Sequence, residues 1–376
     1  MTPVAEHLAN LVRIPSVSRL SNRPLIDYAR GVLRSAQWQT HEFPYQDANG
    51  VEKMNLIAAP PGQPMDDPAA ELAFFCHTDT VPYASDWANA TNPFVRDGFL
   101  HGCGAADVKG FLACLLVAAS EIPHAKFIPG LRLVLTADEE VGCVGARHLL
   151  GSGAIRPRRA VVGEPTSLHP ARAGKGYCLA EVTVFGQEAH SALPQSGASA
   201  IYRAARLIAA IEQFAGELAK QQHPFFDPGF TTLNIGTIQG GTAKNIIAGQ
   251  CHFQLEWRSI PGQAPNTIHD AVFALATNLQ KADNGFSWTM SITRQQSGFE
   301  TAADAPLVRF IQGLAGMEAV SIPFGSEASL LAGISEEVVV FGPGDMQTAH
   351  SSRERVSLSE LEAAVEIVKS LMVGES

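Results

Sequence analysis

The stretch Leu72-Ala73-Phe74-Phe75-Cys76-His77 decides the fold class, because five apolar residues run directly into a histidine. A short apolar run of this kind predicts a buried strand. Further strands are expected at residues 131–135, 160–163 and 337–341, and helices at residues 111–122 and from Val141 onwards. This alternation of strands and helices indicates an α/β layered domain.

The pattern changes between about residue 175 and residue 295. Strands are expected here at residues 179–185, 232–238, 252–257 and 287–293, with helices at residues 198–214 and 267–279. This β-α-β-β-α-β order is a split βαβ unit of the ferredoxin-like kind, complete in itself. We therefore expect an α+β domain at residues 176–295, inserted into a catalytic domain made of residues 1–175 and 296–376.

Length and charge limit the possible functions. A chain of 376 residues is long for a single core, so we expect two domains. A hydrophobic fraction of 46% with 17% charged residues is typical of a globular protein. The formal net charge of −10 would repel nucleic acid and anionic lipid, and neither is expected as a partner. The longest apolar run, residues 111–119, is too short to span a membrane.

The first residues show no basic segment followed by an apolar one, so no secretory signal is expected, and a cytoplasmic location follows by default. The six cysteines form no C-x-x-C pair, which argues against a disulfide framework and a zinc knuckle. We expect them to be reduced and mostly buried.

Side chains that can bind a metal follow several of the predicted strands, except for Asp107, which lies in a Gly-rich turn before a predicted helix. They are His77, Asp107, Glu139, Glu140, Glu164 and His350. Ligands of open α/β sheets bind beyond the carboxyl ends of the strands, so these residues could converge although they are far apart in sequence. Imidazoles and carboxylates without thiolates suit zinc, cobalt or manganese in a functional site. The set is too large for one four-coordinate ion and would be used fully by two divalent ions that share a carboxylate.

Asp79 and the paired glutamates could support such ions. In His77-Thr78-Asp79, the carboxylate of Asp79 could accept the second imidazole N–H of His77. Glu139 and Glu140 follow a strand, where successive side chains alternate, so one could bind metal while the other acts as a general base. Each residue also has a simpler interpretation, since Glu139 and Glu140 could cap the helix expected from Val141.

These motifs together resemble the M20 metallopeptidase family, and within it the acetylornithine deacetylases. The segments that carry the resemblance are His77-Thr78-Asp79-Thr80-Val81-Pro82, residues 102–110, Ala137-Asp138-Glu139-Glu140-Val141-Gly142, Gly163-Glu164-Pro165-Thr166 and Ala349-His350. The resemblance implies a mixed-sheet, helix-flanked catalytic domain like that of zinc exopeptidases. It also implies that a cis peptide follows Asp107.

The resemblance further implies roles for the site residues. Glu139 would be the catalytic base and Asp79 the partner of His77. One ion, zinc or else cobalt, would be held by His77, Asp107 and Glu164. The other would be held by Asp107, Glu140 and His350.

The inserted domain is similar to the family's lid or dimerisation domain, which implies a homodimer. By this resemblance His190 would help to polarise the scissile carbonyl in the partner subunit's site. Asn245 and Arg258 would hold the substrate carboxylate, and Gly325 and Ser326 match acetylornithine deacetylases. The sequence departs from the family pattern at Cys103, Val108 and Ala248, which leaves the choice of substrate open.

The expected reaction is therefore hydrolysis of a small-molecule N-acyl-L-amino acid. N2-acetyl-L-ornithine, cleaved to L-ornithine and acetate in arginine biosynthesis, is the first choice. Acetylcitrulline deacetylation, succinyl-diaminopimelate desuccinylation and a glutamate-releasing carboxypeptidase activity are alternatives. A non-catalytic binding or scaffold relative is disfavoured, because an inert chain could have lost Glu139 without loss of folding.

Overall fold

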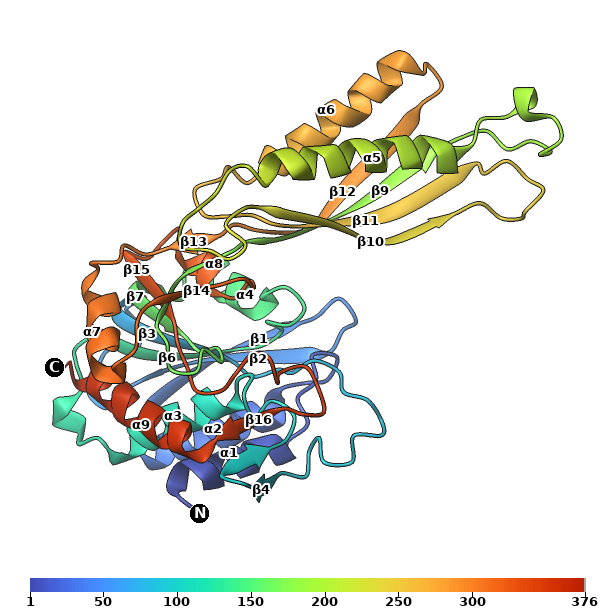
Figure 1. The fold of residues 1–376 in the computed structure, drawn as a ribbon. Helices are drawn as coiled ribbons and strands as arrows, with labels where there is room; N and C mark the ends of the chain where they lie inside the picture. The colour runs from blue at the N-terminus through green and yellow to red at the C-terminus, as the bar shows by residue number, and fades with distance from the viewer. Residues whose placement is uncertain (375–376) are drawn as a thin grey trace. The chain divides into compact units, whose positions relative to one another are not determined.

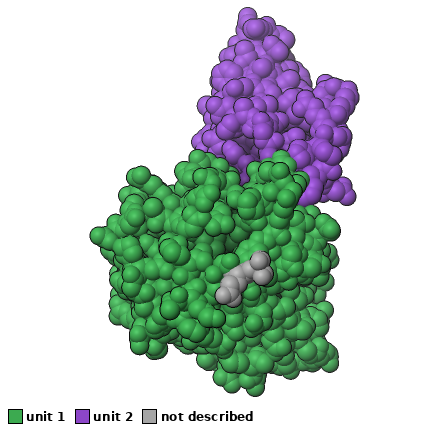
Figure 2. All heavy atoms as spheres, turned by 90° about the vertical axis from the view of Figure 1, so that its left-hand side faces the viewer, with its two compact units in different colours: residues 1–173, 300–320, 326–376 green, residues 174–299, 321–325 purple. Residues whose placement is uncertain are grey.

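The computed structural model describes residues 1–374, and the chain divides into two compact units (Figures 1 and 2). The first unit consists of Met1–Ala173, Glu300–Val320 and the chain from Ser326 onwards. The second consists of Gly174–Phe299 and the short segment Ser321–Gly325. No helix within the described residues is long and apolar enough to cross a membrane.

A mixed β-sheet forms the centre of the first unit, which confirms the expected fold class. Its strands follow the order β1-β2-β6-β3-β7-β15-β8-β13, and β14 pairs with β8. The strands β3, β6, β7 and β15 are mutually parallel, whereas β2 runs antiparallel to its neighbours β6 and β1. Their bounds are β1 Gln39–Gln46, β2 Glu52–Ala59, β3 Ala69–His77, β6 Leu131–Thr136, β7 Arg156–Val162, β8 Ala171–Gly174, β13 Phe299–Glu300, β14 Val320–Ile322 and β15 Glu337–Val340.

Helices cover this sheet because their apolar faces must be buried. The helices α1 (Pro3–Arg13), α2 (Arg23–Ser35), α3 (Lys109–Glu121) and α9 (Leu358–Val373) gather on one face, with α3 innermost (Figure 1). Eleven residues of α3 are buried, in keeping with its apolar sequence. The short helices α4 (Val144–Gly151) and α8 (Ala328–Leu331) lie on the other face, and α7 (Pro306–Ala315) packs against α9.

The parallel strands end at one edge of the sheet, and this edge positions the site. His77 is the last residue of β3 and pairs with Thr136, the last residue of β6. Three further strands form a small separate sheet: β4 (Phe94–Arg96), β5 (Phe99–His101) and β16 (Arg355–Ser357). The six cysteines are free and buried, as expected.

The helix expected from Val141 begins later, at Val144, and this expectation was wrong by one turn. The reason is local backbone geometry: Gly142 and Cys143 have φ of 119° and 55°, which an α-helix excludes. Residues 138–143 therefore form a turn that follows β6, and this turn carries Glu139 and Glu140.

The second unit has the predicted β-α-β-β-α-β order. Its elements are β9 (Tyr177–Phe185), α5 (Ala200–Leu218), β10 (Thr232–Gly240), β11 (Gln250–Arg258), α6 (Thr267–Ala282) and β12 (Ser287–Gln296). The antiparallel sheet has the order β10-β11-β9-β12, which is the arrangement of a ferredoxin-like unit. Alternate residues of β9, such as Cys178, Ala180 and Val182, form a core with apolar residues of α5 and α6.

Gly163 tests how closely the first unit is packed at the site edge. It follows β7, and a Cβ there would lie 2.2 Å from Cδ1 of Phe111 in α3. We expect Gly163→Ala to lower the free energy of unfolding by about 1–3 kcal/mol, because the ring must move within a close-packed core. Denaturant titration measures the change.

The matched control is Gly216→Ala in α5, where no heavy atom lies within 4 Å of the added methyl. This variant should be as stable as the parent, or more stable by up to about 1 kcal/mol. Equal stability of the two variants would contradict the close approach at Gly163.

Candidate active site

The predicted metal ligands come together at the carboxyl edge of the parallel strands. His77 ends β3, Glu139 and Glu140 follow β6, and Glu164 follows β7. Two groups have ligand atoms that all lie within 4.8 Å of one another: His77, Glu139 and Glu164 form the first, and His77, Asp107 and Glu140 form the second. His350 is the remaining member of the cluster. With it, five chain segments that are distant in sequence supply the ligand atoms.

Asp107 lies between the two imidazoles. Its Oδ1 is 3.2 Å from Nε2 of His77, and its Oδ2 is 3.1 Å from Nε2 of His350. The same Nε2 of His350 is 3.1 Å from Oε1 of Glu140. Each oxygen of Asp107 therefore faces a different histidine, which is the arrangement that a carboxylate shared by two ions requires. The peptide bond between Asp107 and Val108 is cis.

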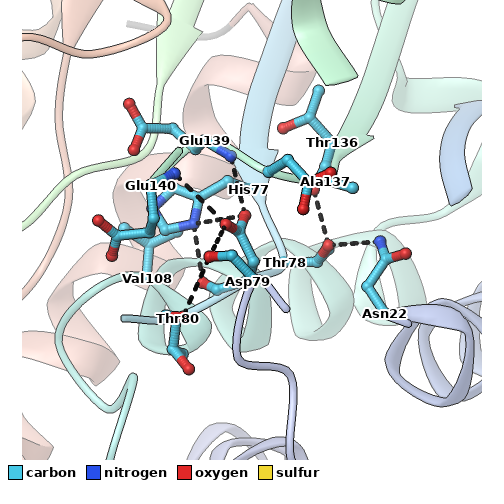
Figure 3. A network of polar contacts seen from close by, with 12 residues as sticks. Asn22, His77, Thr78, Asp79, Thr80, Val108, Thr136, Ala137, Glu139 and Glu140 are labelled. Carbon is cyan, nitrogen blue, oxygen red and sulfur yellow. Dashed lines mark hydrogen bonds and ion pairs between the residues drawn. The ribbon is translucent and has the colours of Figure 1, made fainter. Parts of the chain in front are cut away.

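Asp79 contacts the site through a different atom from the one expected (Figure 3). Nδ1 of His77 lies 3.0 Å from the backbone carbonyl of Asp79, whereas the carboxylate Oδ1 is 3.6 Å away. The carboxylate instead accepts hydrogen bonds from the backbone N–H groups of Glu139 at 3.0 Å and Glu140 at 3.3 Å, and from Ser18 Oγ at 2.7 Å. Asp79 thus orients the ring through its main chain and the two glutamates through its side chain.

Two further contacts hold the neighbouring strand ends. The hydroxyl of Thr78 donates to the carbonyl of Thr136 at 2.7 Å and accepts from Nδ2 of Asn22 at 2.8 Å. These bonds join the ends of β3 and β6 to the loop before α2. These bonds therefore fix the position of the backbone at the end of β3, where His77 lies.

A buried ion pair holds the turn that carries the glutamates. Asp138 has a left-handed backbone with φ of 58°, and its carboxylate accepts from Nζ of Lys53 at 2.8 Å and from the Tyr45 hydroxyl at 2.8 Å. Lys53 and Asp138 are 1% and 2% exposed, so this pair is shielded from water. Glu139 and Glu140 point to different ligand groups because of this turn, and not because of the strand alternation expected from the sequence.

Burial and mutual repulsion set the electrostatics of the cluster. Burial raises the pKa of Glu139 to about 8, and burial together with the nearby Asp107 raises the pKa of Glu164 well above its usual value. Hydrogen bonds to Asp107 and Glu140 raise the pKa of His350 to about 10. Burial opposes the charge on His77, yet Asp107 and Asp79 keep its pKa well above the usual value. Carboxylates outnumber imidazoles here, so the donor set fits divalent cations that would compensate the excess negative charge.

Glu327 is a further acid at this edge that sequence reasoning did not select. It is 1% exposed, and its Oε1 has no hydrogen-bond partner among the described residues. Burial raises its pKa to about 7, while His77 opposes that shift. Gly325 and Ser326 are among the predicted site residues, and the place of Glu327 directly after them was the signal that could have identified it.

Within the second unit, His190 and Asn245 lie together. His190 forms a β-bridge with Ile246, and the N–H of Ser191 donates to the carbonyl of Asn245 at 3.0 Å. Both residues are exposed and lie beyond the end of the sheet where Gln250 pairs with Phe185. No predicted metal ligand belongs to this part of the chain.

Arg258 lies at the opposite end of the same sheet, where Trp257 pairs with Cys178. The strand β11 spans Gln250–Arg258, and eight steps along it cover roughly 26 Å at ~3.3 Å per residue. Asn245 and Arg258 are expected from the family resemblance to hold one carboxylate, but within a single chain the structure does not bring them together.

Arg258 belongs to a compact group around Tyr177. The guanidinium carbons of Arg258 and Arg294 lie 3.6 Å and 4.2 Å from the centre of the Tyr177 ring. The Nε of Arg258 donates to Glu256 at 2.8 Å, and that of Arg294 donates to Gln296 at 2.7 Å. A Cβ on Gly325 would lie 3.1 Å from Cβ of Tyr177, so this glycine approaches the group closely. Arg294 was not predicted, because its role depends on pairing between strands.

The comparisons with known proteins agree with this geometry. The family described as peptidase family M20/M25/M40 matches residues 73–373. The chain belongs to this family. Acetylornithine deacetylase from Myxococcus xanthus is 43% identical over 355 residues, 94% of this chain and 92% of that protein. Acetylornithine deacetylase from Photorhabdus laumondii is 31% identical, with 99% and 97% covered.

Solved structures of M20 proteins share the fold. A tripeptidase from Staphylococcus aureus has a TM-score of 0.78 at 23% identity, with 99% of this chain and 97% of that chain covered. A dinuclear metal binding peptidase of the M20 family from Bacillus subtilis has a TM-score of 0.69 at 15% identity, with 99% and 97% covered. This M20 protein is thus a hydrolase that acts on amide bonds.

The two neighbouring glutamates of this M20 hydrolase can be separated by isosteric substitution. We expect Glu139→Gln to retain bound metal and to lose activity by about 10²–10⁴-fold, as for a missing general base. We expect Glu140→Gln to lose metal, because the amide is a weaker ligand than the carboxylate. Elemental analysis after gel filtration, together with initial rates at saturating metal, distinguishes them. If the Glu139 variant loses its metal and regains its rate when metal is added, then Glu139 is the ligand and Glu140 is the base.

Proposed function

We propose that this hydrolase removes the acyl group from an N-acyl-L-amino acid, and that its substrate is N2-acetyl-L-ornithine. The products would be L-ornithine and acetate, as in arginine biosynthesis. The observation that carries this proposal is the 43% identity to an acetylornithine deacetylase over 94% of the chain. The buried cluster of carboxylates and imidazoles supplies the chemistry that such a reaction needs.

The cofactor we propose is a pair of divalent ions, zinc or cobalt. His77, Asp107 and Glu164 would hold one ion, and Asp107, Glu140 and His350 the other. The division of the two Asp107 oxygens between the two histidines supports this assignment. When bound, such ions polarise a carbonyl and lower the pKa of a water molecule.

Glu139 is the proposed general base. Its carboxylate takes a proton from the attacking water while the water oxygen bonds to the carbonyl carbon. The carbon–nitrogen bond then breaks, and Glu139 passes the proton to the departing amine nitrogen. Burial raises the pKa of Glu139 to about 8 in the ion-free site, so its side chain can hold a proton there. Asp79 supports this role, since its carboxylate holds the backbone of Glu139 at 3.0 Å.

We propose a homodimer in which the partner's His190 and the partner's Asn245 complete each site. An N-acyl amino acid is about 10 Å long, comparable with two or three residues of extended chain. It cannot bridge the roughly 26 Å that separate the His190 end of the sheet from Arg258 in one chain. If Arg258 holds the substrate carboxylate, the groups at the far end of the sheet come from a second copy.

Metal removal and a substrate panel test the reaction. We expect the chelated protein to be inactive and to regain activity with zinc or cobalt. The panel comprises acetylornithine, acetylcitrulline and succinyl-diaminopimelate, with acetylornithine expected to have the highest kcat/KM. Full turnover by protein shown to be metal-free would end the metal proposal. A higher kcat/KM on another member of the panel would end only the choice of substrate.

Mixed dimers test donation across the interface. A hydrogen-bond donor at the developing oxyanion contributes about 2.7–4 kcal/mol, so His190→Ala should be nearly inactive with its metals intact. This variant is mixed with inactive Glu139→Gln under conditions where subunits exchange. In a hybrid dimer with donation in trans, one site has both defects and the other has neither, so activity reappears.

Donation within one subunit gives the opposite result, because every site in every dimer then carries one defect. Mass spectrometry of differentially tagged chains verifies that hybrids form. Verified hybrids that stay at the residual rate of the parents would rule out the partner's His190 as the donor.

A further inference from the structure

The turn that carries Asp107 encloses a carboxylate from a distant part of the chain. Glu354 is 2% exposed, and its Oε2 accepts the backbone N–H of Gly104 at 3.0 Å. Its Oε1 accepts the N–H groups of both Ala106 and Asp107 at 3.1 Å. One side chain thus satisfies three backbone donors of this turn, including the N–H of the proposed shared ligand itself.

These donors belong to an irregular turn. The turn contains Gly104 with φ of 77°, so its backbone follows neither a helix nor a strand. Buried N–H groups without an acceptor are strongly disfavoured, and an ionised carboxylate is the side chain that can accept several of them at once. The conformation that directs Asp107 toward the histidines therefore depends on Glu354.

The same residue is connected to the second ligand-bearing segment. Glu354 lies four residues after His350, and its N–H donates to the carbonyl of Ser351 at 3.0 Å. Its own carbonyl accepts the N–H of Gly102 at 3.3 Å, and Arg355 pairs with His101 in the small sheet. Main-chain pairing and the Glu354 carboxylate thus join the segment of His350 to the turn of Asp107.

We propose that Glu354 is a positioning residue that sets Asp107 relative to His350, so that the pair is preformed before metal binds. This inference rests on the metal-binding part of the proposed function. Glu354 is outside the proposed set of metal ligands. The inference also assigns an order to the assembly of the site: the backbone of the turn is in place first, and the ion binds afterwards.

The test is Glu354→Gln in the full-length protein. The amide has nearly the same shape, but whichever way it turns, its NH2 group faces at least one N–H of the turn. We expect metal affinity to fall by about 10–100-fold, as for other residues that orient ligands. Competition with a chromogenic zinc chelator measures it. At saturating metal, KM should stay within about twofold while kcat falls, because the substrate groups are untouched.

Glu337→Gln is the matched control. Glu337 is also a buried carboxylate that accepts a backbone N–H, that of Leu307 at 2.7 Å, but it lies at the opposite end of β15 from the site. We expect this variant to keep the metal affinity of the parent, whatever stability it loses. Equal metal affinity in both variants would reduce Glu354 to an ordinary buried cap and overturn the proposal.

A second measurement does not depend on a variant that folds. In metal-free parent protein, amide hydrogen exchange of Gly104, Ala106 and Asp107 should be slow, because the turn is preformed. Exchange at the rate of an open loop, with protection only after metal is added, would contradict the proposed order. A parent that binds no zinc would overturn both this inference and the metal site, whereas a metal-binding parent with unprotected amides would overturn this inference alone.

Discussion

The rest of the structure depends on one constraint, the concentration of negative charge in a buried place. Asp107, Glu139, Glu140 and Glu164 share the carboxyl edge of the parallel strands, and each lies close to at least one other acid. Two imidazoles cannot compensate them, and isolated charges are costly in a low dielectric. Such a cluster needs a rigidly held backbone and a compensation of its charge, which divalent cations would supply. The arrangement around the cluster follows from these two needs.

Rigid turns meet the first need. The acids do not lie on the strands themselves but in the turns that follow, where backbone groups lack strand partners. Asp79 satisfies the N–H groups of Glu139 and Glu140, Lys53 pairs with Asp138, and Glu354 satisfies the turn of Asp107. Each supporting residue is buried, so solvent does not compete for these bonds. The proposed ligands are thus held by a frame of other charged residues.

The sequence predicted the parts of this frame that are local. The apolar run before His77 identified a strand and its end, and the positions of Asp107, Glu164 and His350 after other elements indicated convergence at one edge. It could not show that Asp79 uses its carbonyl for His77, because that depends on the geometry of the chain after β3. It could not select Glu354, whose partner Gly104 lies 250 residues away. Glu327 and Arg294 were missed for the same reason, since their significance lies in contacts and burial.

The second unit shows that two motifs predicted to bind one group can lie far apart in the folded chain. The motifs with Asn245 and Arg258 were read as one binding group, because both match positions that hold a carboxylate. An antiparallel sheet separates them, since β11 leads from one end of the sheet to the other between them. The proposed homodimer would resolve this separation, because each subunit would supply the His190 end of its sheet to its partner and receive the same in return. The length of a single strand, and not any contact within one chain, is therefore the observation that supports the proposed dimer.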